Sequence, residues 1–346
     1  MRLLALSSGV VLALPVVVLV VLGFGASYSP SGWLTLLAVA LLVAGALVAW
    51  RRPPGARGIA GAGIAIVVVV VLVRLARAGS GGTTLETLPG PVGSRWLARV
   101  VDEQDASLVG ARALAWAWDL PLPERAELVP AMHDAYVAMR ASEGMTASPI
   151  LDTFVGRQSP DAFDTIMIEP LGTAPPPDTA VVFLHGFGGS FTLECWMMAE
   201  AARTIGALTV CPATTFAGRW WTSDGERTLR ATLAALDARH IRRVFLAGLS
   251  NGAIGASLLA VRVGRRFEGL ILISGASGNG GSRELPTLVV HGRDDTRIPA
   301  ASARAFAART GATYADFEGG HFVMMVRRAE VRGAIARFLA ESTAHK

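Results

Sequence analysis

The chain has 346 residues, 52% of them hydrophobic, and a mean hydropathy of +0.45. This composition excludes an ordinary soluble protein, so we expect part of the chain to lie in lipid. A net charge of +5 would suggest nucleic acid as a partner, but the charge is unevenly placed. Six of the 32 basic residues, and none of the 27 acidic ones, lie in the first 85 residues. The basicity belongs to the apolar N-terminal part, and nucleic-acid binding is not expected.

Three uncharged apolar stretches lie in this N-terminal part, at 3–24, 33–50 and 59–73. Crossing the hydrocarbon core takes about 20 helical residues. We therefore predict a membrane segment over 1–77 with transmembrane helices at 3–24, 33–50 and 58–76, the third extended by its flanks. A cleaved signal peptide is the alternative for the first stretch, although its apolar run exceeds the roughly 7–15 residues usual in such peptides.

The arginines predict the orientation, because Lys and Arg are retained on the cytoplasmic side of a membrane. With the N-terminus inside, four of the six face the cytoplasm; with the N-terminus outside, only Arg74 and Arg77 do. We therefore expect a multi-pass protein of the cell membrane whose chain after the third span lies outside the cytoplasm. If the third stretch did not cross, that part would be cytoplasmic.

Two further segments follow the membrane part. Residues 78–94 are rich in Gly, Thr and Pro, which predicts a linker. Residues 95–150 have helical periodicity, with Leu128, Met132 and Tyr136 spaced by four, and carry no motif. We expect these helices to pack on the following domain or on the membrane surface; a lid over a substrate is the alternative.

In residues 151–346, short apolar runs alternate with amphipathic helical segments. Such alternation predicts βαβ units and a mostly parallel sheet with helices on both faces. Chemistry in that architecture lies at the carboxyl ends of the strands. The apolar runs are at 163–168, 180–184, 207–210, 243–246, 270–273, 287–290 and 313–317.

A nucleophile motif follows one of these runs. Gly248-Leu249-Ser250-Asn251-Gly252 stands between a buried strand and a helix. The turn is too tight for side chains two positions either side of the serine, whose hydroxyl is pushed into the open. Outside this strand–helix context the motif would be weak, and a plain turn is the alternative.

An earlier glycine-rich loop is suited to stabilising an oxyanion. His185-Gly186-Phe187-Gly188-Gly189 follows the predicted strand at 180–184. Acyl transfer needs two N–H donors for the tetrahedral intermediate, and we assign the backbone N–H groups of Phe187 and Asn251. A histidine before such a loop is expected to support the loop, not to act as the base.

A serine nucleophile needs an imidazole oriented by a carboxylate. The predicted strand at 287–290 leads into a loop with Asp294 and Asp295, and the strand at 313–317 leads into Gly319-Gly320-His321. Of the six histidines, His321 alone follows a strand on a glycine loop near the C-terminus. No cofactor or metal is expected for this chemistry.

In residues 163–340, these four motifs occur in the order typical of the α/β-hydrolase superfamily, which the chain resembles. The resemblance implies a catalytic domain over 151–346 with no inserted cap and a triad of Ser250, Asp295 and His321. It selects Asp295 over Asp294, because the family's aspartate stands three residues before a β-branched residue and proline, here Ile298-Pro299.

The predicted activity is that of a serine hydrolase acting through an acyl-enzyme, with a small-molecule or lipid ester as substrate. Carboxylic esters with a small apolar acyl or aryl group are favoured. The alternatives are a peptidase or acyltransferase acting on envelope or lipid substrates, and a catalytically idle binding module. The superfamily's motifs do not name a substrate, and the sequence does not predict an oligomeric state.

The segment 275–286 is too short for a cap, so the site is expected to be open above Ser250. Trp220 and Trp221 lie in the loop after Cys211 and are candidates for lining the substrate site. Packing beneath that loop is an equal alternative, because paired tryptophans bury a large apolar area.

The only two cysteines, Cys195 and Cys211, flank neighbouring predicted elements. A disulfide and two buried thiols are equally open alternatives.

Overall fold

The computed structural model describes residues 28–50, 56–79, 81–90, 96–117, 120, 122–172, 176–264 and 266–344. The chain forms two compact units: Met1–Ala78 with Arg99–Leu120, and Gly79–Ala98 with Pro121–Lys346. The predicted helix at 3–24 lies outside the described residues.

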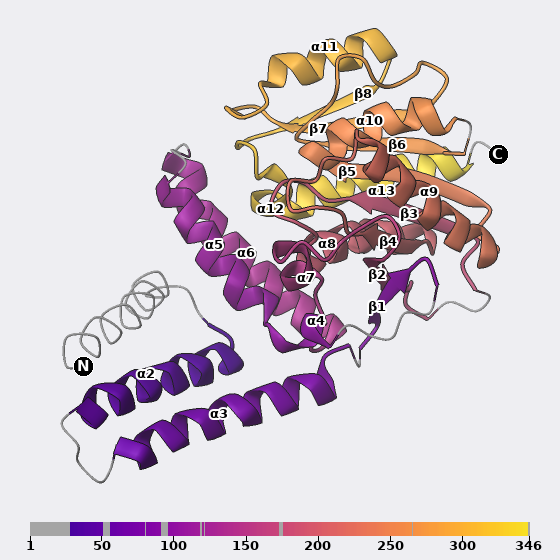
Figure 1. Ribbon diagram of the computed structural model, residues 1–346. Helices are drawn as coiled ribbons and strands as arrows, with labels where there is room; N and C mark the ends of the chain where they lie inside the picture. Colours follow the sequence, from indigo (N-terminus) through magenta and orange to yellow (C-terminus); the bar gives the residue numbers. More distant parts are fainter. Residues whose placement is uncertain are drawn as a thin grey trace. The chain divides into compact units, whose positions relative to one another are not determined.

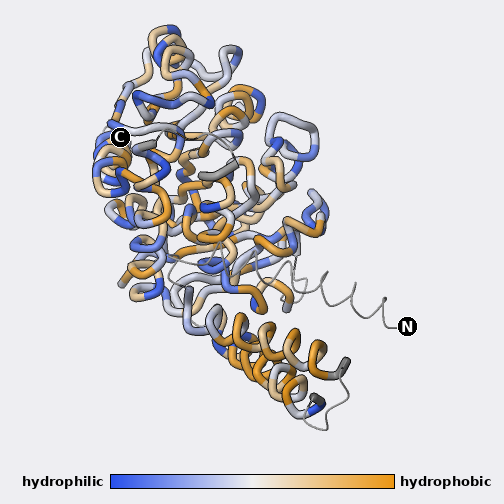
Figure 2. The backbone as a smooth tube through the Cα atoms, turned by 90° about the vertical axis from the view of Figure 1, so that its left-hand side faces the viewer, coloured by the Kyte–Doolittle hydropathy of each residue, from blue (hydrophilic) through white to orange (hydrophobic). Residues whose placement is uncertain are grey.

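The first unit contains the two other apolar helices, α2 (Pro30–Trp50) and α3 (Ala56–Arg77), which pack on each other. By length and composition both could cross a membrane. Figure 2 shows hydrophobic colour along both helices, and many of their large apolar side chains are exposed, including Trp33, Ile64 and Leu72. Helices over 33–50 and 58–76 are therefore confirmed, and their crossing of a membrane stays a prediction.

Small residues let these two helices approach closely. A side chain on Gly45 would lie 2.9 Å from the Cβ of Ala60, and one on Gly63 would lie 2.8 Å from the carbonyl of Ala38. Helix pairs in membranes commonly associate through such small residues, because close backbone contact replaces the hydrophobic effect.

The unit also includes α5 (Glu103–Ala117), which polar contacts tie to the other two helices. The backbone N–H of Ser29, just before α2, donates to Asp105 Oδ1 at 2.7 Å. Near the end of α3, Arg74 Nη1 donates to Asp102 Oδ2 at 2.9 Å, with both side chains largely buried.

The second unit is built on an eight-stranded sheet with the order β1-β2-β4-β3-β5-β6-β7-β8. Strands β3 to β8 are parallel, and β1 and β2 pair antiparallel at one edge. The strands are β1 (Thr83–Leu88), β2 (Phe163–Ile168), β3 (Thr179–Leu184), β4 (Leu208–Pro212), β5 (Arg243–Leu249), β6 (Gly269–Ile273), β7 (Thr287–Gly292) and β8 (Thr313–Phe317). All seven apolar runs are confirmed as strands.

One strand corrects the sequence prediction. Thr83–Leu88 lies in the segment 78–94 predicted as a linker, yet it pairs with all of β2. Glycines before it and proline and glycine after it suggested a flexible segment. As an edge strand, β1 needs only partial burial, so the long apolar run that identifies a central strand is absent.

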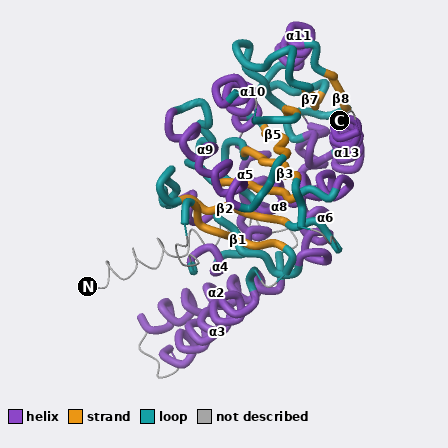
Figure 3. The backbone as a smooth tube through the Cα atoms, turned by 90° about the vertical axis from the view of Figure 1, so that its right-hand side faces the viewer, coloured by secondary structure: helices purple, strands orange, loops and turns teal. Residues whose placement is uncertain are grey.

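Helices cover both faces of the sheet, as Figures 1 and 3 show. On one face α8 (Thr192–Ala202) and α13 (Arg328–Ala344) pack together; on the other lie α9 (Ser223–Ala238), α10 (Asn251–Val263) and α11 (Ala300–Thr310). The remaining elements are α4 (Leu97–Val100), α6 (Leu122–Glu143), α7 (Ile150–Phe154), the short η1 (Arg203–Ile205) and α12 (Val323–Val326).

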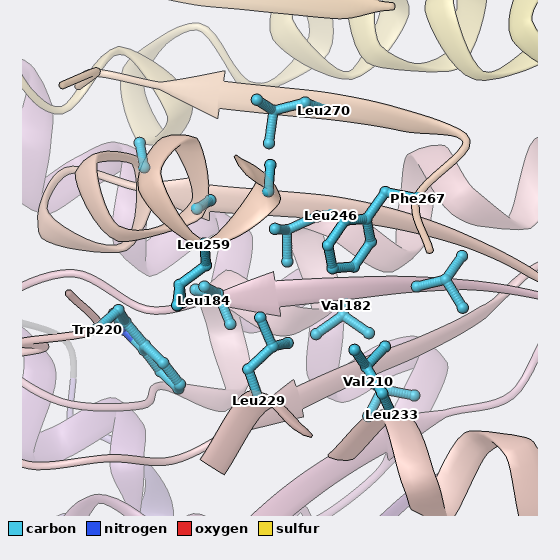
Figure 4. Close-up of a cluster of buried hydrophobic side chains, with 14 of the residues drawn as sticks. Val182, Leu184, Val210, Trp220, Leu229, Leu233, Leu246, Leu259, Phe267 and Leu270 are labelled. Carbon is cyan, nitrogen blue, oxygen red and sulfur yellow. The ribbon is translucent and has the colours of Figure 1, made fainter. Parts of the chain in front are cut away.

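Successive side chains of a strand point to opposite faces of the sheet, so every second residue of a strand packs into the core on one face. Val182 and Leu184 of β3 and Leu246 of β5 point to the face covered by α9, α10 and α11, where they meet Leu229 and Leu259. Figure 4 shows these side chains as one cluster. Because both faces are covered, the central strands are buried along their whole length.

The helical region 95–150 divides between the units. Helix α5 belongs to the first, whereas α6 packs on α8 and α12 of the second. Near the end of α6 the buried Glu143 pairs with Arg203 at 2.7 Å and accepts from Thr83 Oγ1 at 3.1 Å. Part of this region therefore packs on the domain that follows it.

Candidate active site

Ser250 stands at the turn between β5 and α10. Its φ of 53° and ψ of −117° form a conformation that L-residues rarely adopt. A side chain on Gly252 would collide with the carbonyl of Leu184, and one on Gly248 would collide with Gly252. Both glycines are therefore required by close backbone contacts, and the serine hydroxyl is held at the carboxyl end of the sheet.

The structure brings Ser250 together with His321 and Asp295 from the loops after β8 and β7. His321 Nε2 lies 2.9 Å from Ser250 Oγ, and His321 Nδ1 lies 2.8 Å from Asp295 Oδ2. An ionised carboxylate only accepts, so Nδ1 carries the proton and Nε2 accepts from the serine hydroxyl.

Asp295 is held as an anion. Burial alone would raise its pKa, but hydrogen bonds from His291, His321 and the backbone of Ile298 outweigh burial and hold the pKa well below its usual value. His291 Nε2 lies 2.8 Å from the carbonyl of Ile298 and 3.3 Å from Asp295 Oδ2, so this nitrogen donates to both. Asp294, by contrast, is exposed.

The two assigned oxyanion donors stand beside the nucleophile. A side chain on Gly186 would lie 3.2 Å from Ser250 Cβ, which places Phe187 next to the reacting centre. Asn251 is the first residue of α10, where backbone N–H groups have no partner within the helix. The arrangement is suited to holding a negative oxygen close to Ser250.

The mostly parallel sheet carries these groups at the carboxyl ends of β3, β5, β7 and β8, in that chain order. The chain has an α/β-hydrolase fold. Residues 274–286, between β6 and β7, contain no helix or strand, so the fold has no cap inserted there.

No protein-family model and no curated protein matches the chain. Solved structures do. Est1E from Butyrivibrio proteoclasticus with bound ferulic acid is 16% identical, with 54% of this chain and 99% of that chain covered and a TM-score of 0.45. An alpha-beta serine hydrolase homologue from Coxiella burnetii is 19% identical, with 51% and 91% covered and a TM-score of 0.40. A predicted CIB-like hydrolase from Thermoplasma acidophilum is 19% identical, with 51% and 92% covered and a TM-score of 0.42. These identities are too low to transfer a substrate.

In this α/β-hydrolase domain His185 supports residues 186–189, the glycine-rich loop with the predicted oxyanion donor Phe187, which we call the oxyanion loop. Its Nε2 accepts the backbone N–H of Thr214 at 3.1 Å, so its Nδ1 donates to the carbonyl of Gly186 at 2.8 Å. Burial lowers the pKa of His185 to about 4, and the imidazole stays neutral near pH 7. The supporting role predicted for it agrees with these contacts.

The two tryptophans differ. Trp220 is fully buried in the core of the hydrolase domain (Figure 4), and its indole N–H donates to the carbonyl of His185 at 2.9 Å. Of the two alternatives for Trp220, packing is therefore the one observed, because its side chain is fully buried and has no surface exposed to a substrate. Trp221 is half-buried, and its carbonyl accepts from Arg262 at 2.9 Å.

Sequence reasoning missed Glu124, at the start of α6. Its Oε1 accepts the backbone N–H of Phe322 at 2.7 Å, next to His321, and its carboxylate occupies the space that a side chain on Gly320 would need. Burial raises the pKa of Glu124, against the smaller opposing effect of that hydrogen bond. An acidic residue in a first helical turn is common, so no signal in the sequence distinguished it.

Two aromatic residues were also missed. The ring of Phe216, in the loop after β4, contacts both the ring of Phe187 and the ring of Phe154 of α7. Phe154 precedes Phe187 by 33 residues and Phe216 follows it by 29, so no periodic pattern in the sequence links the three residues. Among the residues that the structure describes, no group of three His, Cys, Asp or Glu side chains is placed to hold a metal ion.

Proposed function

We propose that this protein is a serine hydrolase that cleaves carboxylic esters with a small apolar acyl or aryl group. The observation that carries the proposal is the continuous hydrogen-bonded chain from Ser250 Oγ through His321 to Asp295, at 2.9 and 2.8 Å. Such a chain activates a hydroxyl that would otherwise be a poor nucleophile.

The proposed reaction has two halves. Ser250 Oγ attacks the ester carbonyl carbon and its proton passes to His321 Nε2, while the N–H groups of Phe187 and Asn251 hold the oxyanion. The carbon–oxygen bond to the alcohol then breaks, and the alcohol oxygen takes the proton from His321. In the second half, water attacks the carbonyl carbon of the acyl-enzyme and gives a proton to His321 Nε2. The bond between this carbon and Ser250 Oγ then breaks, the acid is released, and Ser250 Oγ takes the proton back from His321.

We further propose that the hydrolase domain is anchored in the cell membrane and lies outside the cytoplasm. Two described helices long and apolar enough to cross a membrane support the anchoring. The arginine distribution supports the orientation. A disulfide joins Cys195 and Cys211, and disulfides persist mainly in oxidising compartments, which supports the same side.

Labelling by a fluorophosphonate probe tests whether Ser250 is activated. The full-length protein in detergent should be labelled covalently and Ser250→Ala should not. Absence of labelling in the wild type would contradict the proposal and favour an idle binding module.

A panel of p-nitrophenyl esters tests the substrate class. Acetate and butyrate should be cleaved with higher kcat/KM than esters with acyl chains beyond about ten carbons. A preference for long chains, or activation at a lipid interface, would instead indicate a membrane lipid as substrate. A higher kcat/KM for thioesters or aminoacyl amides than for these esters would contradict the proposal that the protein is a carboxylic ester hydrolase.

A further inference from the structure

Three phenylalanines from separate segments form an aromatic cluster in the hydrolase domain, consisting of Phe154, Phe187 and Phe216. The ring centroids of Phe154 and Phe216 are 4.8 Å apart with an interplanar angle of 50°, and those of Phe187 and Phe216 are 4.8 Å apart at 69°. The second pair has the edge-to-face geometry that aromatic rings prefer, and both separations are typical of packed aromatic pairs. The cluster is therefore a formed structure and not three unrelated surface rings.

The aromatic cluster is open to solvent. Phe154 is 58% exposed and Phe187 is 50% exposed. Phenylalanines used for packing in this domain, such as Phe163, Phe183 and Phe245, are fully buried. A contiguous exposed apolar surface is uncommon and marks a binding site more often than a scattered exposed residue does.

The cluster adjoins the reacting centre through its backbone. Phe187 carries one proposed oxyanion donor, and the next N–H, of Gly188, donates to the carbonyl of Phe216 at 2.9 Å. The side chain of Asn251, which carries the other donor, donates to the carbonyl of Ala217 at 2.8 Å. The loop that holds Phe216 thus touches both residues proposed to hold the oxyanion.

Helix α7, which carries Phe154, packs on the loop that contains Phe187 and Gly189. A side chain on Gly189 would lie 2.9 Å from Thr153 Cγ2 and 3.2 Å from Ile150 Cδ1, so α7 packs directly on the oxyanion loop. This contact places the end of the helical region beside the site, which leaves Phe154 next to Phe216 with its ring exposed.

The proposed reaction distinguishes two sides of the site. The leaving alcohol receives its proton from His321 Nε2, so it lies on the side of His321, where Glu124 and Phe322 are found. The carbonyl oxygen points to the N–H groups of Phe187 and Asn251. We therefore expect the acyl group, on the side away from His321, to lie near Phe187, whose ring belongs to the aromatic cluster.

We propose that the aromatic cluster of Phe154, Phe187 and Phe216 binds the acyl part of the substrate, and that this part is a flat aromatic or compact apolar group. The inference rests on the proposed ester hydrolysis and assigns acyl recognition to the cluster in place of Trp220. Open ring faces and edges offer dispersion and edge-to-face contacts that an acetyl group is too small to use.

Acyl selectivity at a constant leaving group tests this assignment. In the full-length protein in detergent, kcat/KM is measured for p-nitrophenyl benzoate and p-nitrophenyl acetate. Phe154→Ala and Phe216→Ala should each lower the benzoate-to-acetate ratio about tenfold, which corresponds to about 1.4 kcal/mol. Phe154→Leu, which keeps apolar bulk and loses the ring, should lower it less.

Val137→Ala provides the matched control, because Val137 is an apolar residue of α6, 52% exposed and outside the cluster. The benzoate-to-acetate ratio of kcat/KM in Val137→Ala should equal that of the wild type. Thermal unfolding checks that each variant is folded. A second arm compares phenyl acetate with ethyl acetate, where the acyl group is constant and Phe154→Ala should leave the ratio unchanged.

The outcomes separate this inference from the proposed function. If the wild type cleaves these esters and the benzoate-to-acetate ratio stays the same in folded Phe154→Ala and Phe216→Ala, the acyl assignment is overturned. A change confined to the alcohol arm overturns it in favour of alcohol binding. A wild type that cleaves no ester overturns both proposals.

Discussion

At the scale of single residues, neighbours in the sequence play different parts. Asp295 is buried and accepts from His321, whereas the adjacent Asp294 is exposed. Asp295→Asn keeps the shape but cannot hold the imidazole tautomer, so kcat for p-nitrophenyl acetate should fall about 10³–10⁴-fold. Asp294→Asn is the matched control and should change kcat less than about threefold. Equal losses would show that the acid is misassigned.

Glu124 supports the histidine loop from another helix. In Glu124→Ala the partly buried N–H of Phe322 loses its acceptor, which should lower the free energy of unfolding by about 1–3 kcal/mol. Glu124→Gln keeps an acceptor and should lose less. Urea unfolding measures both, and kcat/KM should follow the same order because Phe322 adjoins His321. Identical stability of the two variants would show that the hydrogen bond contributes nothing measurable.

His185 should make stability depend on pH. The unfolded imidazole binds a proton below about its ordinary pKa of 6.5, whereas the folded one, with a pKa of about 4, stays neutral. The free energy of unfolding should therefore fall by up to about 3 kcal/mol between pH 6.5 and pH 4.

His185→Gln tests this dependence, because its amide oxygen can accept from Thr214 but does not titrate. Urea unfolding from pH 7 to pH 4 should show a smaller decrease in the variant than in the wild type, whatever its overall stability. Parallel decreases in both proteins would assign the pH dependence to other groups.

At the scale of elements, a disulfide joins α8 to β4. Cys195 and Cys211 have Cα atoms 6.0 Å apart and are separated by 16 residues. Closing a loop of this size stabilises the fold by about 3 kcal/mol in the chain-entropy model. The oxyanion loop precedes α8 and the loop with Phe216 follows β4, so the bond ties together the elements that carry both.

Cys195→Ala/Cys211→Ala should therefore lower the free energy of unfolding by about 3 kcal/mol. Reductant should lower the melting temperature of the wild type and leave that of the double variant unchanged. A wild type that is insensitive to reductant, with two free thiols by mass analysis, would contradict the disulfide.

At the scale of the whole molecule, the prediction concerns the side of the membrane. Three spans with the N-terminus inside place the C-terminus outside the cytoplasm. A reporter that is active only outside the cytoplasm, fused after Lys346, should therefore be active. Activity of a cytoplasmic reporter at the same position would exclude the three-span, N-in arrangement.

The sequence by itself determined seven of the eight strands of the sheet and the polar groups at their ends. Buried parallel strands are continuous apolar runs, and each of the seven runs is a strand. The residues of the candidate triad could be predicted because chemistry at a strand end depends on short local motifs. Gly248 and Gly252 mark the turn at Ser250 for the same reason: the close contacts that require them lie within a few residues of one bend and one neighbouring strand end.

Only the tertiary structure decided which distant side chains surround that site. Strand β1 depends on its partner β2, because an edge strand lacks an apolar run of its own. Glu124 reaches Phe322 across 198 residues, and Phe154 meets Phe216 across 62 residues. Trp220 and Phe216 lie in one loop, yet one is buried in the core and the other joins an open cluster. Contacts of this kind arise from packing between elements, which leaves no periodic pattern in the sequence of either partner.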